Sequence, residues 1–389
     1  MNNIEKLYKI AQKKERLIIG LMSGTSLDGL DIALCKFSGS GLSTRVTLLQ
    51  FETVPYPNVF KEEIKKIFSK KMVDLELLCL MNEKIGLVHA EYINQTLKKW
   101  EITNLQIDAI ASHGQTIFHS PFIKHQNPEY PNGTLQIGDG DHIAVKTGII
   151  TLSDFRQKNI AAGAEGAPLA VYGDYLLFNA AEKNTVLLNI GGIANITYLP
   201  KTGKVFSSDL GPGNTLIDQF MQREFGLYFD KDAEHAKKGT VDKSLLTALM
   251  QNPFFEAKLP KSTGPELFNL EYLDSCIAKT NAKISSFDIL ATLCEFTSTG
   301  ISRALKNLDT GFDLIVSGGG IHNPLIMDRL KHHLPLANFK NIEEFGISAD
   351  AKEAILFALL ANETLAGETV DFKTKTVPNI CMGKICFPN

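Results

Sequence analysis

SGTSLDG, at residues 23–29, joins two apolar runs, Leu17–Met22 and Leu30–Phe37, and each run is typical of a β-strand. A second glycine-rich stretch, NIGGIAN at residues 189–195, also lies between two apolar runs. Glycine lets a backbone approach a ligand closely, and exposed N–H groups with Ser or Thr hydroxyls suit a phosphate. Two such turns predict two related lobes that offer backbone loops to one ligand, as in a two-lobed nucleotide-binding enzyme.

Composition narrows the class of protein. The chain has 389 residues, 44% of them hydrophobic and 21% charged, which is enough for two domains with cores. Nucleic-acid binding is not expected, because the net charge is −3 and the sequence has no basic run. No uncharged apolar run reaches about 18 residues, so no membrane partner is expected. Six widely spread cysteines match no zinc pattern and are typical of a protein of the reducing cytoplasm.

The pattern of elements predicts an α/β protein. Strands alternate with helices, and the early strands are joined as hairpins, which favours mixed sheets in two lobes, residues 1–165 and 166–389. A last helix at about residues 349–366 is apolar on most sides, so it is expected to be buried and is a candidate to pack back on the N-terminal lobe. Residues 153–168 are rich in small residues and are expected to form a loop.

Three polar segments are candidates for chemistry near phosphates or sugars. A strand over Ile107–Ser112 is expected to end at His113, and open α/β sheets place ligands at such ends. Asp28 in the first turn would repel a phosphate unless a divalent cation lay between them. Gly318–Gly320 form a strand–glycine–helix junction that could pass close to a nucleoside or phosphate. The alternatives are a structural role for His113, a plain hairpin turn around Asp28 and a tight strand-to-helix turn at Gly318–Gly320.

Carboxylates supply the candidates for proton transfer. Asp209 is expected at a strand end beside a rigid turn, a suitable place for a general base, although an Asp there is also a common turn residue. Glu353 lies in an otherwise apolar helix and points either to solvent or into a cleft. Asp154 and Arg156 are either functional or a plain ion pair in a loop. The sequence lacks the P-loop and Rossmann glycine patterns, which disfavours those two phosphate sites.

These motifs together resemble the anhydro-N-acetylmuramic acid kinase family, in family order across nearly the whole chain. The opening MSGTSLDGLD (22–31) carries most of the resemblance. The further matches are SHGQT (112–116), TLQIGD (134–139), DFR (154–156), GAPL (166–169), LNIGGIAN (188–195), DLGPGN (209–214) and SGGGIHN (317–323). One departure is Asn159, which stands where the family usually has Asp.

The resemblance implies an actin-like sugar-kinase fold, with ATP and Mg²⁺ in a cleft between the lobes, in a cytoplasmic homodimer that recycles cell wall. The implied reaction opens the 1,6-anhydro bond of 1,6-anhydro-N-acetylmuramic acid with water and transfers the γ-phosphoryl group to the freed O6, giving N-acetylmuramic acid 6-phosphate. An ordinary sugar kinase acting on a free hydroxyl and a non-catalytic nucleotide sensor are the alternatives.

Site residues follow from the resemblance. It implies that Asp209 is the general base, that Glu353 is a second carboxylate which orients the attacking water, and that Asp28 binds Mg²⁺ directly or through water. The predicted ATP-binding residues are Gly24, Thr25, Ser26, Leu27, Asp28, Gly29, Leu30, Asp31, Gly191, Gly192, Gly318, Gly319, Gly320 and Asn323. The predicted sugar-binding residues are His113, Gln136, Asp154 and Arg156.

Overall fold

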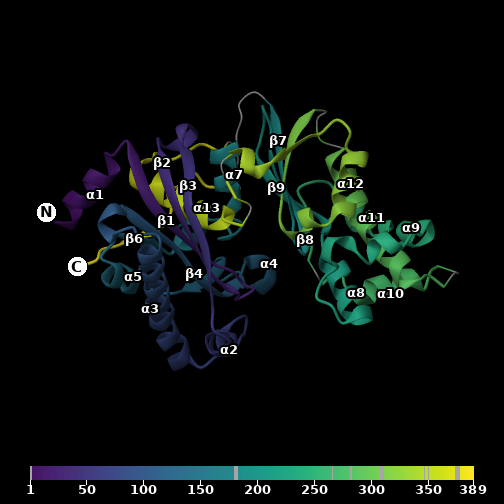
Figure 1. Ribbon diagram of the computed structural model, residues 1–389, viewed down its shortest axis with the longest axis horizontal. Coiled ribbons are helices and arrows are strands. Elements are labelled where there is room, and N and C mark those ends of the chain that lie inside the picture. Colours follow the sequence, from purple (N-terminus) through teal and green to yellow (C-terminus); the bar gives the residue numbers. More distant parts are fainter. Residues whose placement is uncertain are drawn as a thin grey trace. The chain divides into compact units, whose positions relative to one another are not determined.

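The chain divides into two compact units in the computed structural model (Figure 1). Unit 1 comprises residues 1–177 and 345–389, and unit 2 comprises residues 178–344. The structure describes residues 2–178, 183–264, 266–280, 283–306, 308, 311–345, 347–348, 350–372 and 377–389. Among these residues, no helix is long and apolar enough to cross a membrane.

Unit 1 is built on a mixed sheet with the strand order β3-β2-β1-β4-β6-β12, with β5 paired to β4. The first three strands form an antiparallel meander, whereas β4 runs parallel to β1 and β6 runs parallel to β4. The strands are β1 (Glu15–Ser23), β2 (Gly29–Ser38), β3 (Arg45–Pro55), β4 (Ala109–Ser120), β5 (Gly133–Ile137), β6 (Thr151–Ser153) and β12 (Lys384–Cys386).

Helices cover this sheet, and one of them comes from the far end of the chain. α13 packs against β1, β2 and β4, and Figure 1 shows it in yellow beside the purple strands. Nearly all of its side chains are buried, as expected for a helix that is apolar on most sides. The α-helices of unit 1 are α1 (Asn3–Ala11), α2 (Asn58–Ile67), α3 (Leu75–Lys99), α4 (Phe122–His125), α5 (Gly140–Thr147), α6 (Phe155–Ala161), α7 (Ala170–Phe178) and α13 (Lys352–Ala366), and its 3₁₀-helices are η1 (Gly41–Ser43) and η2 (Asn104–Gln106).

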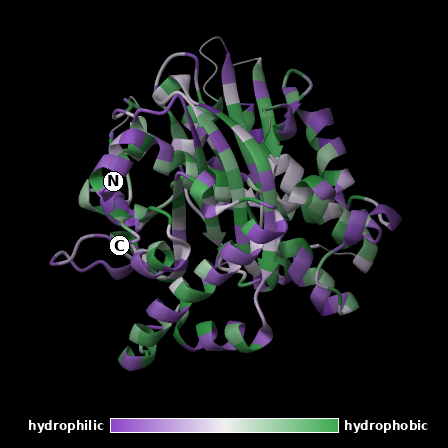
Figure 2. Cartoon of the chain, turned by 60° about the vertical axis from the view of Figure 1, so that its left-hand side comes forward, coloured by the Kyte–Doolittle hydropathy of each residue, from purple (hydrophilic) through white to green (hydrophobic). Residues whose placement is uncertain are grey.

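Most of the surface helices have two distinct faces. α3 begins at Asp74, whose side chain accepts a hydrogen bond from the Leu77 backbone N–H, and its buried face includes Met81, Ile85 and Ile93. Figure 2 shows the corresponding alternation of hydrophilic and hydrophobic bands along the helices. The apolar faces join the strands in one core cluster of unit 1.

Unit 2 repeats the same strand plan. Its sheet has the order β9-β8-β7-β10-β11, again an antiparallel meander of three strands followed by two parallel neighbours. The strands are β7 (Asn184–Ile190), β8 (Ile193–Leu199), β9 (Phe206–Pro212), β10 (Phe312–Ser317) and β11 (Asn338–Asn341). The repetition confirms the predicted α/β class with mixed sheets, and a pair of units with one shared plan agrees with the actin-like kinase fold.

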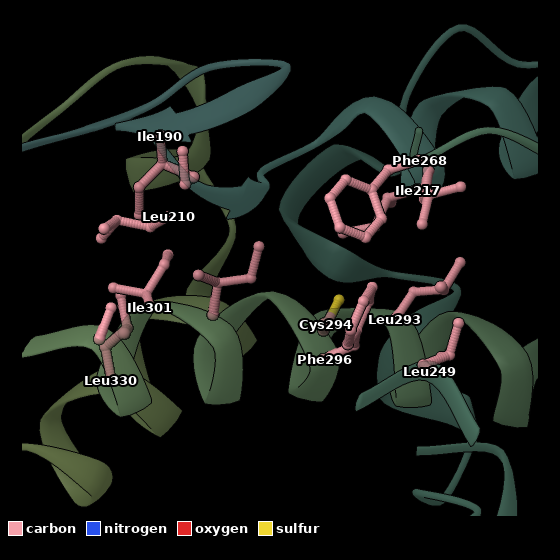
Figure 3. Close-up of a cluster of buried hydrophobic side chains, with 14 of the residues drawn as sticks. Ile190, Leu210, Ile217, Leu249, Phe268, Leu293, Cys294, Phe296, Ile301 and Leu330 are labelled. Carbon is pink, nitrogen blue, oxygen red and sulfur yellow. The ribbon is translucent and has the colours of Figure 1, made fainter. Parts of the chain in front are cut away.

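The core of unit 2 lies between this sheet and α11, whose side chains are almost all buried. Figure 3 shows Ile190 and Leu210 from the strands facing Ile301 of α11, with Phe268 and Phe296 farther along the same core. The helices are α8 (Thr215–Phe225), α9 (Lys243–Met250), α10 (Leu270–Ile277), α11 (Ser286–Leu305) and α12 (Pro324–His333), with 3₁₀-helices η3 (Lys231–Ala233), η4 (Ala236–Lys238), η5 (Pro253–Glu256), η6 (Gly319–His322) and, at the boundary, η7 (Ile342–Phe345).

Three expectations about local structure were wrong. β4 does not end at Ser112 but continues to Ser120, because β5 pairs with its second half. Residues 153–168 are not all loop: α6 forms there because Phe155 and Asn159 are buried and hold it in place. Asp209 lies inside β9 rather than at its end. The predicted start of the last helix, Ala349, lies outside the described residues.

Candidate functional site

Unit 1 contains a cavity of about 400 Å³ in which three of the predicted sugar-binding residues meet. His113 of β4, Gln136 of β5 and Asp154 after β6 all line it. The Gln136 side-chain nitrogen donates to the hydroxyls of Thr116 (3.1 Å) and Thr134 (2.8 Å). Its carbonyl oxygen is buried and accepts no hydrogen bond within the described part of the chain. Such an oxygen can accept a hydrogen bond from a ligand hydroxyl or amide.

His113 presents a second buried polar atom of this kind. Arg156 Nε donates to His113 Nε2 at 2.9 Å, so the imidazole proton lies on Nδ1, which has no partner among the described residues. Burial, assisted by the charge of Arg156, lowers the pKa of His113 to about 3, so the ring is neutral near pH 7. His113 therefore offers an N–H donor, and Gln136 an acceptor.

Arg156 is half-buried and interacts with several polar groups of unit 1. Besides His113, it donates to the Gly166 carbonyl oxygen at 2.7 Å. Burial lowers the pKa of Arg156, and the nearby Glu353 carboxylate acts in the opposite direction. Desolvation likewise raises the pKa of Glu353, while Arg156 lowers it and Asp31 raises it. Glu353 is exposed in the first turn of α13, and its place in a ligand site stays a prediction.

Asp154 is held in an unusual backbone conformation. Its φ of 59° lies in the left-handed region, which an Asp adopts far less readily than a glycine. Its carboxylate pairs with Lys384 of β12, a residue that also lines the cavity. The strained residue places a carboxylate at the cavity wall directly before α6, which carries Arg156.

A network of buried hydrogen bonds holds the base of the first glycine-rich turn. Ser23 donates to the Gln115 side chain (2.5 Å), Tyr56 donates to Ser23 (2.8 Å), and the Tyr56 hydroxyl lies 2.8 Å from His89 Nε2. Gln115 in turn donates to the Gly24 carbonyl oxygen at 3.4 Å. These bonds fix the base of the hairpin while Thr25, Ser26 and Asp28 at its tip stay exposed.

The eight predicted ATP-binding residues of this hairpin have different tasks. Leu27 and Leu30 are buried, and a side chain at Gly29 would lie 2.4 Å from the Val54 carbonyl oxygen, so these three serve packing. A Cβ at Gly24 would meet its nearest neighbour at 3.4 Å, so nothing inside the protein demands a glycine there. Gly24 is therefore the better candidate for close approach of a ligand.

The first glycine-rich turn has carboxylate oxygens that could be ligands of magnesium. Asp28 Oδ1 accepts from Ser26 Oγ (2.7 Å) and from the Gly29 N–H (3.1 Å), which leaves its second carboxylate oxygen for another ligand. Asp31 is bonded by Thr53, and its pKa is raised by burial and by the charges of Asp28 and Asp350. In the described part of the chain, no three acidic, His or Cys side chains gather into a complete metal site. Magnesium commonly uses only one or two carboxylates with water and substrate phosphates.

Backbone hydrogen bonds join the second glycine-rich turn to the start of α8. The carbonyl oxygen of Gly191 accepts from the Asn214 N–H (2.8 Å), and that of Gly192 accepts from the N–H groups of Gly213 (2.8 Å) and Thr215 (3.1 Å). A side chain at Gly213 would lie 2.2 Å from the Gly191 oxygen, so this close contact requires a glycine. Turn and helix therefore form one rigid corner of unit 2.

Asp209 has one restrained carboxylate oxygen. Oδ2 accepts from Ser262 Oγ at 3.0 Å and from the Thr263 backbone N–H at 2.9 Å. The Asp209 N–H donates to the Lys261 carbonyl oxygen at 2.9 Å, so the 261–263 segment follows β9 closely. Both donors to the carboxylate are neutral, and the residue is half-buried. This arrangement orients the carboxylate and leaves Oδ1 available to take a proton.

Among the glycines after β10, two are required by the backbone turn and one is not. Gly318 has a φ of 86°, and side chains at Gly318 and Gly320 would meet Asn189 and Ile190 at under 3 Å, so both are needed for the turn. A Cβ at Gly319 would meet only the Asn214 side chain, at an ordinary contact distance of 3.8 Å. The Asn323 side chain accepts from the Ile326 N–H at 3.2 Å and so caps α12, a structural task in addition to the predicted one.

Several residues at these sites were missed by sequence reasoning. Ser262 and Thr263 lie in a stretch without a motif, and only the fold brings them to Asp209. Lys384 is far from Asp154 in sequence and carries no local signal. Asn159, the departure from the family pattern, is a buried structural residue that accepts from the Gly166 N–H and donates to the Tyr172 hydroxyl.

Comparison with known proteins gives matches over nearly the whole chain. The family described as anhydro-N-acetylmuramic acid kinase matches residues 16–377. The anhydro-N-acetylmuramic acid kinase of Pseudoalteromonas atlantica is 50% identical, covering 100% of this chain and 99% of the relative. That of Caldanaerobacter subterraneus is 39% identical, covering 98% and 100%. Among solved structures, a ROK hexokinase from Thermus thermophilus covers 88% of this chain and 96% of its own, at 14% identity and a TM-score of 0.35.

Proposed function

Because this chain belongs to the anhydro-N-acetylmuramic acid kinase family, we propose that it is an ATP-dependent kinase that acts on 1,6-anhydro-N-acetylmuramic acid. Water attacks the anomeric carbon, the bond from that carbon to O6 breaks, and O6 takes the γ-phosphoryl group of ATP. The products are N-acetylmuramic acid 6-phosphate and ADP. This reaction recovers an amino sugar released from the cell wall.

One observation in the molecule supports a sugar substrate more than any other. His113 and Gln136 both line the cavity of unit 1, and His113 Nδ1 and Gln136 Oε1 are buried atoms without a hydrogen-bond partner in the described residues. Buried polar groups without partners are costly, so a ligand with hydroxyl or amide groups would stabilise them. We assign His113, Gln136 and Asp154 to sugar binding, with Arg156 holding His113 in the required tautomer.

The chemistry is assigned to two carboxylates. Asp209 is the proposed general base, because Ser262 and Thr263 fix one of its oxygens and leave the other for the proton of water. Glu353 is proposed as the second carboxylate that orients water, and the charge of Arg156 opposes the rise in its pKa that desolvation causes. The leaving O6 remains on the same sugar and is captured by phosphorus, which reduces the need for a strong protein acid.

Nucleotide binding is assigned to the two turns and to the junction after β10. Direct phosphate or nucleoside contact is assigned to Thr25, Ser26, Gly24 and Gly319, where a side chain would not be crowded. Asp28 would hold Mg²⁺ through its second oxygen, directly or through water. When bound, the ion would supply positive charge to the phosphoryl group in transfer.

We further propose that the protein acts in the cytoplasm as a homodimer. Its six cysteines are free thiols, which suits a reducing compartment. The homodimer rests on the family resemblance, and sedimentation of the purified protein tests it.

An isotope experiment tests the reaction. The protein is incubated with ATP, Mg²⁺ and 1,6-anhydro-N-acetylmuramic acid in ¹⁸O-water, and the product is analysed by mass spectrometry. We expect a sugar phosphate with one ¹⁸O at the anomeric position. Unlabelled product kept in ¹⁸O-water corrects for spontaneous exchange. A phosphorylated sugar without solvent oxygen would instead indicate an ordinary kinase acting on a free hydroxyl.

A further inference from the structure

Unit 2 has a cavity of its own, of about 970 Å³, that the proposed reaction does not use. It is lined by Phe206 at the start of β9, by the last turns of α11 and by the segment after η5. The strand register places Phe206 beside Tyr198, which pairs with Val186 near the start of β7. The cavity therefore lies at the opposite end of the sheet from the turn at Gly191.

The charges around this cavity are predominantly positive. Among the described lining residues, four are lysine or arginine and one is acidic. Lys258, Lys306 and Arg303 are exposed, and Glu256 pairs with Arg303. His333 also lines the cavity, but it is bonded to Glu295, which pairs with Arg329 as well. The remaining positive charge suits an anion, and the arginine fork with lysine point charges suits a phosphate.

Lys261 is held in a fixed position at the wall of the cavity. Its ammonium group donates to the Phe254 carbonyl oxygen at 2.7 Å and lies 4.2 Å from the centre of the Phe254 ring. Burial lowers the pKa of Lys261, and the charge of Arg303 lowers it further, while Glu256 acts in the opposite direction. A bound anion would relieve this crowding of cations.

The floor of the cavity is aromatic. Phe206 and Phe255 line it, and Phe255 is almost fully buried. Flat apolar rings beside cationic groups suit a ligand with an apolar face and a charged substituent, such as a sugar ring that carries a phosphate. The volume is sufficient for a ligand of that size.

Two contacts lead from the cavity to Asp209. The Lys261 carbonyl oxygen accepts from the Asp209 N–H, and the next two residues, Ser262 and Thr263, donate to its carboxylate. In addition, the Phe255 ring fills the space beside Gly211, where a Cβ would lie 3.0 Å from it. A shift of Lys261 would therefore move the two residues that bond to the Asp209 carboxylate. A shift of Phe255 would change the packing at Gly211, two residues after Asp209.

We propose that this cavity binds a phosphorylated sugar and that its occupation repositions Asp209 through Lys261 and the 262–263 segment. The first part of this proposal, binding of a phosphorylated sugar, does not depend on the proposed reaction. The regulatory half rests on the proposed function, since it requires Asp209 to be the base. A sugar phosphate released by the reaction, or by another kinase, would then slow turnover from this distant cavity.

A binding experiment tests the first half. N-acetylmuramic acid 6-phosphate is titrated by calorimetry into protein that already holds excess 1,6-anhydro-N-acetylmuramic acid and a non-hydrolysable ATP analogue. We expect binding to the wild type, at least about tenfold weaker binding to the K258Q/K306Q double variant, and no change in the matched K243Q/K279Q variant, whose lysines are exposed on α9 and near the end of α10. Equal binding to wild type and K258Q/K306Q, or none to either, would overturn the proposal.

Two further titrations identify the ligand chemistry. N-acetylmuramic acid without phosphate is expected not to bind, and inorganic phosphate is expected to bind more weakly than the sugar phosphate. If inorganic phosphate bound as tightly as the sugar phosphate, the cavity would be a site for free phosphate, and the assignment to a sugar phosphate would be wrong.

Initial rates test the regulatory half. Added N-acetylmuramic acid 6-phosphate is expected to lower kcat of the wild type with KM for the anhydro sugar unchanged, and this effect is expected to be lost in K258Q/K306Q. Inhibition that only raises KM, equally in both proteins, contradicts it. If the protein did not phosphorylate the anhydro sugar at all, the proposed function would fail, but the calorimetric result on the cavity would still stand.

Discussion

The two units share a strand order but hold their candidate carboxylates in opposite ways. Glu353 of unit 1 lies at an exposed position near a cation, Arg156, and its pKa is raised, with desolvation as the largest cause. Asp209 of unit 2 is half-buried and is bonded by two neutral donors, Ser262 and Thr263. Two neutral donors fix the orientation of the Asp209 carboxylate, whereas the charge of Arg156 lowers the pKa of Glu353 against the effect of desolvation. The same strand plan therefore surrounds the two candidate carboxylates with different neighbours.

The largest effect is expected from the base itself. Asp209→Asn preserves the hydrogen bonds from Ser262 and Thr263 to a side-chain oxygen but removes the proton acceptor, so we expect kcat to fall by about 10²–10⁴-fold with ATP binding retained. Steady-state rates and calorimetry with ATP measure the two quantities. Asp313→Asn, in β10 of the same sheet, is the control and should keep normal turnover. Near-normal turnover of Asp209→Asn would refute the assignment.

Removing the cation of unit 1 should affect stability in a pH-dependent way. Arg156→Met leaves His113 Nε2 and the Gly166 oxygen without their donor, so we expect a loss of about 1–3 kcal/mol of unfolding free energy. Because Glu353 has a raised pKa, the folded state favours its protonated form, and the loss should be smaller at pH 5 than at pH 8, where the carboxylate must stay charged.

Denaturant unfolding at both pH values measures this difference. The double variant R156M/E353Q should lose the pH dependence, since the carboxylate that interacts with Arg156 is gone. The exposed Arg45→Met serves as the control and should stay close to wild type. A loss in Arg156→Met that is the same at both pH values would show that Glu353 and Arg156 are not coupled.

The glycines of the first turn separate packing from ligand binding. Gly29→Ala brings a Cβ to 2.4 Å from the Val54 oxygen and should cost about 1–3 kcal/mol of stability. Gly24→Ala meets no such contact, so its unfolding free energy should change by less than about 0.5 kcal/mol. We nevertheless expect the KM for ATP to rise in Gly24→Ala. If its KM stayed unchanged, the phosphates would not approach Gly24.

Near neutral pH, the smallest effect is expected from the neutral histidine, which influences stability only in acid. The pKa of His113 is about 3, below its ordinary value near 6.5, so the unfolded chain binds a proton that the folded protein does not. Stability should therefore fall as pH decreases from about 6.5 to 3, by at most about 1.4 kcal/mol per pH unit from this residue. His113→Gln should flatten that acid limb in unfolding experiments, whereas His332→Gln, at an exposed position on α12, should leave it unchanged.

The elements that could be predicted from the sequence are those specified locally. Both glycine-rich hairpins are confirmed, because an apolar run, a turn and a second apolar run are adjacent in the chain. The extension of β4 to Ser120 was missed because its partner β5 begins thirteen residues later, at Gly133. α6 was missed because Phe155 and Asn159 reveal their anchoring role only once the core around them is formed.

The same limit applies to the candidate site. His113, Gln136 and Asp154 belong to recognisable motifs, and the structure brings them to one cavity. Ser262 and Lys384 lie outside any motif, and their contacts with Asp209 and Asp154 arise from packing of distant segments. Sequence alone also could not separate Gly24 from Gly29, because the difference lies in the position of the Val54 oxygen.

The packing of α13 on β1, β2 and β4 has a consequence for the order of events during synthesis. Its Asn362 accepts a hydrogen bond from Arg16, and its Glu363 accepts one from Thr44, so residues near the two ends of the chain complete one core. Unit 2 is continuous in sequence and can fold while the ribosome is still making the remainder. At about 5–20 residues per second, the strands of unit 1 wait on the order of ten seconds or more for their last helix, and during that interval they expose the apolar face that α13 later covers.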